Sequence, residues 1–364
     1  MKKTIQSYPI LLLLGLISAA PLVNGHHSFT MFDANNPKTI SGTVVEFHWT
    51  NPHTFVDLEV VDENGVKTVW QLEHGPKNML SRRGWNEDSF KSGDRIIVQI
   101  HPLTSGKPGG RFMSYSFVDS DFVDAERSTT IFDIPPPKPV EMSLDVARNL
   151  NGIWVNANGG IHFDSTVSRS EQAPPLRPEY MSRWQERLAK ANVGISINDP
   201  TALCIPAGFP RFLGMVYPGE ILQAEHQINW YAEWGESTVR IYLDGRPQPD
   251  PLEVSYNGYT TGKWNGNILE THTIAMKAET LIDTTGVPHS DQLEVTMFIK
   301  KLTPDYIEAE IILNDPVAFY EPWRTIKHYA RAPSEFSIQE YSCFEGNRYE
   351  VTADGSVQIK FEEN

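Results

Sequence analysis

Ionisable side chains that could transfer a proton lie close together in the second half of the sequence. Glu270 and His272 are two residues apart in a predicted strand over 268–276, so their side chains point to the same face. Inside an apolar barrel, burial would shift both proton affinities, and the pair could relay a proton as an isomerase or a lyase requires. If this face points outward instead, both groups are solvated, and Leu269 and Ala275 fill the core.

Asp244, Arg246 and His289 form a second candidate group for acid-base chemistry. Asp244 and Arg246 flank a glycine in a predicted turn, where Asp244 can bond its own backbone, and His289 follows a proline in another turn. These residues either form a polar rim that orients a substrate, or serve only in the turns and in an ion pair. The sequence has no Gly-x-Ser-x-Gly motif, so a serine hydrolase of that type has no support.

A small-molecule site is predicted where aromatic residues accompany the strands of a β-barrel, because the mouths of such barrels commonly bind ligands. We expect an apolar cavity in the second half of the chain, lined by Trp230, Tyr242, Tyr256 and Trp264. The preferred function is therefore binding of a small hydrophobic molecule, with cofactor-free acid-base catalysis by the residues above as an extension. A non-catalytic envelope protein that binds a partner is an alternative.

The N-terminal histidines suggest a different chemistry. Two lysines precede an apolar run over 10–20 and a compact cleavage site, which is typical of a secretory signal over residues 1–25. Cleavage there would leave His26 with a free amine and an imidazole, and together with His53 these groups match the ligands that Cu(II) prefers. Alternatively, His26 leads into the first strand and His53 caps a turn. Apart from this copper alternative, no cofactor is predicted.

Length and composition predict the setting in which these residues are placed. The chain has 364 residues with 26 prolines and 25 glycines, which favours two domains rich in turns and an all-β fold. The formal net charge of -15 argues against nucleic acid and anionic membranes as partners. The apolar run of the signal is too short to span a bilayer, and no later run is long enough, so we expect a periplasmic or secreted protein. Its oligomeric state is left open.

Alternating apolar and polar residues predict two β-domains joined by a proline-rich linker over 119–149. The first domain, over 26–118, has three strands, a short helix and two strands, the order of a small five-stranded OB-like barrel. The second domain, over 150–364, suits a larger antiparallel, lipocalin-like barrel. The predicted helices are 76–84 and 178–192, and the predicted strands are 39–49, 54–61, 67–74, 94–101 and 111–118, then 152–154, 220–226, 228–234, 238–243, 268–276, 292–302, 306–313 and 325–330.

The sequence contains two cysteines, Cys204 and Cys343, and both lie in the second half. In an exported protein, such a pair is best interpreted as one disulfide, which would stabilise the fold by about 3 to 5 kcal/mol in the chain-entropy model. Two buried free thiols are the alternative.

Two sets of motifs resemble bacterial exported families. Those over 26–118 resemble the first module of a family of uncharacterised function, and those over 199–347 resemble a recurrent exported domain with a lipocalin-like pattern. Neither resemblance implies a catalytic residue. The first set is His26-His27-Ser28-Phe29, Ser41-Gly42-Thr43-Val44, Trp49-Thr50-Asn51-Pro52-His53 and Arg83-Gly84-Trp85; the second is Phe209-Pro210-Arg211, Tyr217-Pro218-Gly219-Glu220-Ile221, Ile241-Tyr242-Leu243-Asp244-Gly245-Arg246, Gly262-Lys263-Trp264, Pro288-His289-Ser290, Asp315-Pro316, Pro322-Trp323 and Tyr341-Ser342-Cys343.

Overall fold

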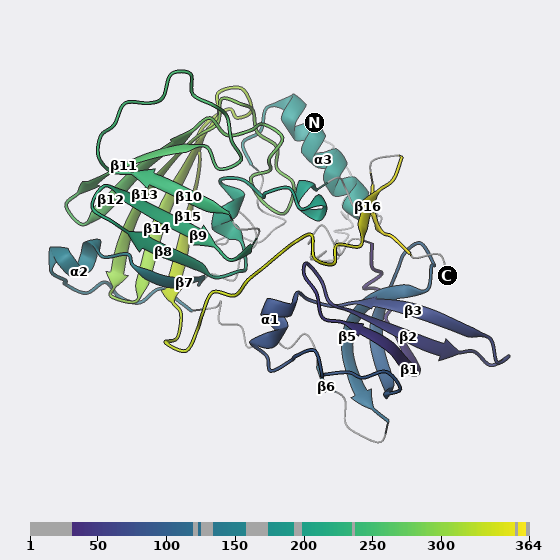
Figure 1. Ribbon diagram of the computed structural model, residues 1–364. Helices are drawn as coiled ribbons and strands as arrows, with labels where there is room; N and C mark the ends of the chain where they lie inside the picture. Colours follow the sequence, from purple (N-terminus) through teal and green to yellow (C-terminus); the bar gives the residue numbers. More distant parts are fainter. Residues whose placement is uncertain are drawn as a thin grey trace, which may run out of the picture.

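Two β-barrels of different size make up the described part of the chain (Figure 1). The computed structural model describes residues 31–118, 123–124, 134–157, 174–192, 199–234, 237–353 and 356–361. The predicted signal and His26 lie outside these residues. The predicted all-β class, with a small mixed barrel followed by a larger one, is confirmed.

The smaller barrel has the strand order of an OB fold. β1 pairs with β2 and β4, β2 pairs with β3, and the parallel pair β3–β5 closes the barrel. A hairpin turn at Gly65 joins β2 to β3, and its φ of +81° is a conformation that glycine adopts without strain. The elements are β1 Lys38–His48, β2 Phe55–Val61, β3 Lys67–Glu73, α1 Lys77–Ser81, β4 Arg95–Pro102, β5 Gly109–Phe117 and β6 Val123–Asp124.

The core of the smaller barrel follows from the alternation along its strands. Val56 and Leu58 of β2 and Leu72 of β3 point inward and are buried with the aromatic rings of Phe90 and Phe112. Polar side chains occupy the positions between them. A shift of one residue in any strand would turn these apolar groups to solvent, so the pattern determines the register.

Nine of the described strands close the larger barrel in the order β10-β11-β12-β13-β14-β15-β7-β8-β9. All neighbours are antiparallel except β10 and β11, which run parallel because the loop between them returns along the barrel. The antiparallel prediction therefore misses one pair. The elements are β7 Gly152–Asn156, β8 Gly219–Gln223, β9 Gln227–Ala232, β10 Thr238–Tyr242, β11 Tyr259–Asn265, β12 Ile268–Ile274, β13 Glu294–Thr303, β14 Tyr306–Asn314 and β15 Trp323–Arg331.

Helical segments lie at the two ends of the larger barrel. At one end, α2 (Leu144–Arg148) lies beside the end of β13, where Lys301 donates to the carbonyl of Val146. At the other, α3 (Pro178–Asn192) matches its predicted range, and Trp184 donates to Thr285 in the loop that follows β12. Two short 3-10 helices, η1 (Pro200–Leu203) and η2 (Arg211–Gly214), lie at this second end, which we call the α3 end.

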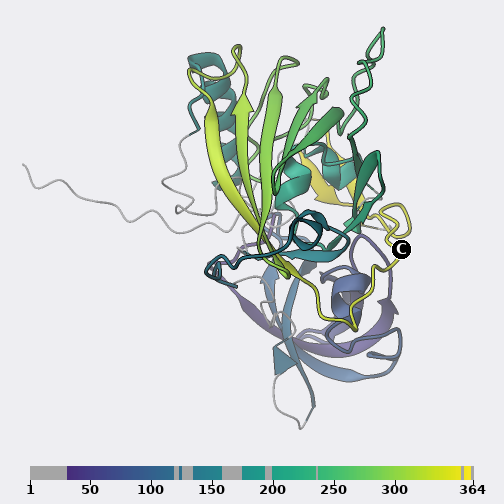
Figure 2. The ribbon, with the colours of Figure 1, turned by 90° about the vertical axis from the view of Figure 1, so that its left-hand side faces the viewer.

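The C-terminal segment leaves the larger barrel and packs against the smaller one (Figures 1 and 2). β16 (Tyr349–Val351) and β17 (Val357–Ile359) form a hairpin, and Ile359 is buried with Phe55 and Leu103 of the small barrel. The end of the predicted second domain is thus shared between the two barrels. The hairpin has too few apolar residues for its packing on the small barrel to be predicted from the sequence.

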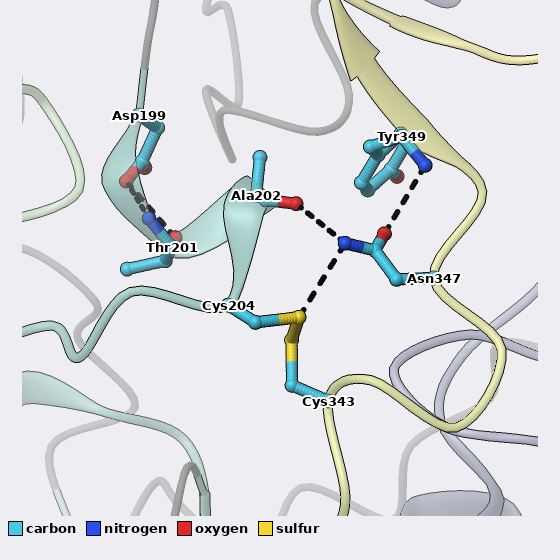
Figure 3. Close-up of a disulfide and its surroundings, with 7 residues drawn as sticks. All are labelled: Asp199, Thr201, Ala202, Cys204, Cys343, Asn347 and Tyr349. Carbon is cyan, nitrogen blue, oxygen red and sulfur yellow. Dashed lines mark hydrogen bonds between the residues drawn. A yellow bond between two sulfur atoms is a disulfide. The ribbon is translucent and has the colours of Figure 1, made fainter.

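The predicted disulfide is present. Cys204 and Cys343 are bonded, with 139 residues of sequence separation, and Asn347 donates to the sulfur of Cys204 and to the carbonyl of Ala202 (Figure 3). The bond fixes the C-terminal segment to η1 before that segment reaches the small barrel. A disulfide is consistent with an extracytoplasmic location. In the described part of the chain, no helix is long and apolar enough to cross a membrane.

Candidate ligand-binding site in the larger barrel

A cavity lies inside the larger barrel at its α3 end. Its volume is about 20 Å³, room for about one water molecule. This cavity is small, and of the four aromatic residues predicted to line a cavity it is lined by Trp230 alone. The lining residues come from β7, β8, β9, β15 and the segment around η2: Trp154, Asn156, Phe212, Leu213, Met215, Tyr217, Gly219, Trp230, Ala232 and Tyr329.

Trp230 lies at the centre of this lining. Its ring meets Phe212 edge to face at 5.8 Å and Tyr329 at 5.0 Å between centroids. Such contacts are worth about 0.5 to 1.5 kcal/mol each beyond the area they bury. At position 219, a Cβ atom would lie 2.7 Å from Trp230 Nε1, so only glycine fits beside this indole.

Tyr329 connects the barrel wall to η2. Its hydroxyl donates to the carbonyl of Leu213 at 2.9 Å, and burial raises the pKa of the phenol, which therefore stays neutral. The neutral hydroxyl holds η2 against the barrel wall, and the Phe212 ring packs on Trp230. The site is therefore a small aromatic cavity that η2 partly lines.

The other three predicted aromatic residues do not line this cavity. The Tyr242 ring lies beside Tyr259 and under the Arg246 guanidinium, 4.2 Å from it. Tyr256 packs under the ammonium of Lys277, and Trp264 under the guanidinium of Arg148. These are cation–π pairs at the barrel surface or rim. Composition predicted the aromatic content of the barrel, and the direction of each strand decided which rings face inward.

Of the two orientations considered for Glu270 and His272, the structure has the outward one. On β12 the buried positions are Leu269, Thr271 and Thr273, so the residues between them face outward. Glu270 pairs with Lys263 at 3.1 Å and accepts from Asn265, and these bonds lower its pKa. His272 lies 3.3 Å from Glu294 and is half-exposed. Thr271 and Thr273, whose side chains suit either face of a strand, occupy inward positions of β12.

Asp244 and Arg246 form an ion pair with each other, away from His289. The Arg246 guanidinium donates to both oxygens of Asp244 and lowers the pKa of that carboxyl to about 2. This turn follows the end of β10, whereas His289 follows the end of β12. Because β12 runs antiparallel to β11, and β10 runs parallel to β11, the two turns lie at opposite ends of the barrel.

His289 is buried, and both of its ring nitrogens are engaged. Nδ1 lies 2.7 Å from the carbonyl of Ser290 and Nε2 lies 2.8 Å from the Thr280 hydroxyl. Burial lowers the pKa of the imidazole, so the neutral form donates from Nδ1 and accepts at Nε2. A histidine with both nitrogens occupied holds a loop in place, and this is the structural alternative considered for this residue.

A layer of buried polar residues at the α3 end has no counterpart among the predicted site residues. Asp199 accepts two hydrogen bonds from Arg211, at 2.9 and 2.8 Å. Asp315 accepts from the backbone and the hydroxyl of Ser290. Arg211, Ser290 and Asp315 belong to motifs that are far apart in the sequence, and the structure brings them to this end of the barrel. These motifs are the signal in the sequence that could have identified this end.

Lys327 is also missing from the predicted site. Its side chain is 1% exposed and lies on the inward face of β15, with Thr325 and Tyr329. Thr325, Lys327 and Tyr329 are spaced by two residues, so the alternation of a strand places their side chains on the same face of β15. Lys327 thus adds an amine to an inner wall that also carries the hydroxyls of Thr271, Thr273 and Thr325.

His53, proposed as a copper ligand, lies on the smaller barrel. Its Nδ1 is 3.1 Å from Glu73, and its ring meets Tyr349 of the C-terminal hairpin edge to face. His26 is outside the described residues, so the structure does not test the pair. Within the part of the chain that the structure describes, no group of three or more histidine, cysteine, aspartate or glutamate side chains could hold a metal ion.

Glu73 makes the stability of this junction depend on pH. Burial is the main cause that raises its pKa, while His53 and the hydroxyl of Tyr349 oppose this. Because the folded pKa lies above the ordinary value, the protonated carboxyl favours folding. This contribution is complete below the unfolded pKa and is lost as the pH rises through the folded pKa.

Tyr349→Phe is expected to destabilise the protein more at a pH above the folded pKa of Glu73 than at pH 4. The hydroxyl donates to both oxygens of Glu73 at 2.8 Å, and a hydrogen bond to a carboxylate contributes about 1.5 to 3 kcal/mol. At pH 4 the carboxyl is protonated, so the cost falls to about 1 kcal/mol. Urea unfolding at the two pH values measures this difference. Equal losses at both would show that Glu73 is not the group concerned.

Comparison with known proteins gives a family match that covers most of the first barrel. The model of DUF6152, a family of unknown function, matches residues 14–112, which agrees with the resemblance of the N-terminal motifs. The larger barrel and its cavity lie outside the matched range. No curated protein matches this chain.

Proposed function

We propose that this protein acts in the periplasm or outside the cell and binds a small, largely hydrophobic molecule in its larger barrel. The observation that supports this most directly is the aromatic pocket formed by Trp230, Tyr329 and Phe212. Apolar pockets with a few polar groups are the usual form of small-molecule sites. The polar groups here are the Tyr329 hydroxyl and the amide of Asn156.

The ligand enters by replacing part of η2. The cavity of about 20 Å³ holds about one water molecule, so a larger apolar group must take the space of Phe212. η2 has only four residues. Its displacement breaks the backbone bonds from Phe212 to Gly208, from Leu213 to Pro210 and from Met215 to Phe212, and the bond from the Tyr329 hydroxyl to Leu213. Movement of this short element exposes the indole of Trp230 and leaves the strands unchanged.

The arrangement favours binding over acid-base catalysis. Glu270 and His272 are on the outer face of the barrel, and both nitrogens of His289 are engaged. Asp244 and Arg246 pair with each other at an exposed turn. None of these five residues lines the aromatic pocket, so an isomerase or lyase would require other groups.

Filling the pocket is expected to weaken binding without unfolding the barrel. The neutral fluorescent probe N-phenyl-1-naphthylamine should bind the wild-type protein at micromolar concentration, with transfer of energy from Trp230. Ala232→Leu places extra carbon atoms in the cavity and should weaken binding about tenfold, which corresponds to about 1.4 kcal/mol.

Tyr242→Ala is the matched control, since its ring lies outside the pocket; its affinity for the probe should equal that of the wild type. Circular dichroism confirms that both variants are folded. Failure of the wild type to bind the probe, or equal binding by Ala232→Leu, would contradict the proposed function.

A further inference from the structure

The C-terminal hairpin covers the outer face of β2 and β3 in the smaller barrel (Figure 1). Asp57, Gln71 and Glu73 point to this face, because they alternate with the core residues of the two strands. From the hairpin, Tyr349 donates to Glu73 at 2.8 Å, and Arg348 beside it reaches Asp57. Barrels with this strand order commonly bind ligands on the face of their second and third strands. The hairpin therefore occupies the position of a ligand.

The hairpin fits this face incompletely. Nη1 of Arg348 lies 3.5 Å from Oδ1 of Asp57, which is longer than the distance of about 2.7 to 2.9 Å in a well-formed charge-assisted hydrogen bond. The side chain of Gln71 is 9% exposed, and its Oε1 accepts no hydrogen bond from the described part of the chain. A buried acceptor without a donor is unfavourable. A ligand that brings a donor to Gln71 and a shorter bond to Asp57 would suit the face better than the hairpin does.

The charges on this face suit a cationic ligand. His48 lies between two carboxylates, with Nε2 2.9 Å from Asp57 and Nδ1 3.5 Å from Glu46. An imidazole is positively charged only when it is protonated. In the described part of the chain, the hairpin supplies the one permanent cation that pairs with either carboxylate. Arg111 of β5 acts on Glu73 instead, where its charge opposes the rise in pKa that burial causes.

β16 is the less firmly held strand of the hairpin. Its three residues, Tyr349–Val351, are half-buried or exposed. β17 is held by its own apolar side chains, since Val357 and Ile359 are buried, the latter with Phe55 and Leu103. β16 can therefore leave this face while β17 stays, and the edge of β17 that pairs with β16 is then open to another strand.

We propose that the outer face of β2 and β3 binds a basic, extended segment of a partner protein, which replaces β16 and pairs with β17. An arginine of the segment bonds to both oxygens of Asp57, a geometry that guanidinium and carboxylate groups favour. Side chains on one side of an extended segment recur at every second residue, which is the spacing of Gln71 and Glu73, so donors on alternate residues reach both. The added strand also contributes main-chain hydrogen bonds. This surface is separate from the pocket in the larger barrel.

The test uses the peptide Arg-Tyr-Arg-Tyr-Arg, labelled with fluorescein and amidated, and measures fluorescence anisotropy on the full mature protein. Arg348→Ala removes the side chain that competes for Asp57 and should tighten peptide binding about tenfold. Asp57→Asn, added to this variant, should weaken binding by about tenfold or more. Arg324→Ala is the control, because it removes an equal charge from an exposed position on the larger barrel. It should change the affinity by less than about twofold.

Hydrogen exchange locates the bound peptide. Exchange in Tyr349–Val351 should become faster when the peptide is bound, while Val357–Ile359 stays protected. If the peptide does not bind, or if exchange in Tyr349–Val351 is unchanged at saturation, the proposed surface is overturned. The exchange measurement needs only the wild type, so it is decisive even if a variant does not fold.

Equal changes in affinity for Arg348→Ala and Arg324→Ala would also overturn the proposal. The peptide would then be attracted only by the net negative charge of the protein. Circular dichroism confirms that the variants compared are folded.

Discussion

Glu233→Ala is expected to lower the free energy of unfolding by about 3 to 5 kcal/mol, the cost of leaving a buried charge without its partner. The Glu233 side chain is fully buried and lies just beyond the end of β9. Arg82 donates to both of its oxygens, and Asn78 donates to one at 2.6 Å. The backbone of Gln339 donates to the other at 2.9 Å. Alanine would remove the acceptor of the Asn78 amide and of the Gln339 N–H, and would leave Arg82 with the carbonyls of Asn78 and Ser337 alone.

The loss should be concentrated at the junction of the two barrels. Arg82 and Asn78 belong to the α1 region of the small barrel, Glu233 to the large barrel, and Gln339 to the C-terminal segment. One carboxylate therefore holds three parts of the chain together. Urea unfolding measures the effect, and Glu225→Ala, at an exposed position, is the control, expected to change stability by less than about 0.5 kcal/mol. A loss below about 1 kcal/mol for Glu233→Ala would show that the contact is not a buried charge network.

Removing the disulfide is expected to cost about 5 kcal/mol in the double variant Cys204→Ser, Cys343→Ser. The bond spans 139 residues, and the chain-entropy model assigns the largest stabilisation to loops of this length. The C-terminal hairpin, which carries Tyr349 to Glu73, would also lose its attachment to η1. Denaturant unfolding of the variant, and of the wild type under reducing conditions, should give similar losses.

An unchanged midpoint in both samples would contradict this expectation, because the hairpin would then be held by its apolar contacts alone. Limited proteolysis gives an independent measurement. Cleavage in the C-terminal segment should become faster in the variant, whereas cleavage in β13 and β14, which pair with each other in the wall of the larger barrel, should not.

Local patterns along the chain were sufficient for most of the strands. Alternation in the small barrel predicts five strands and a helix in the order observed, because one buried face imposes a period of two residues. The helix over 178–192 is matched by α3. β11 was not predicted, since its Thr-Thr-Gly-Lys run lacks apolar alternation, and it is held by pairing with β12.

The site was predictable only in part. Trp230 was identified as a ligand-binding residue and lines the pocket. For Glu270 and His272 the sequence left both faces of the strand open, and the structure has them facing outward. Two residues spaced by two share a face in any strand, and the sequence alone does not say which face that is.

The sequence by itself determined the fold class, the two barrels and the pairing of Cys204 with Cys343, because periodicity, turn residues and a single pair of cysteines are local or countable properties. Tertiary structure alone decided which loops lie together at each end of the larger barrel and which aromatic rings face inward. It also decided that Glu233 connects the two barrels. These depend on contacts between residues far apart in the chain, and the free energy of such contacts comes from burial, which no single segment specifies.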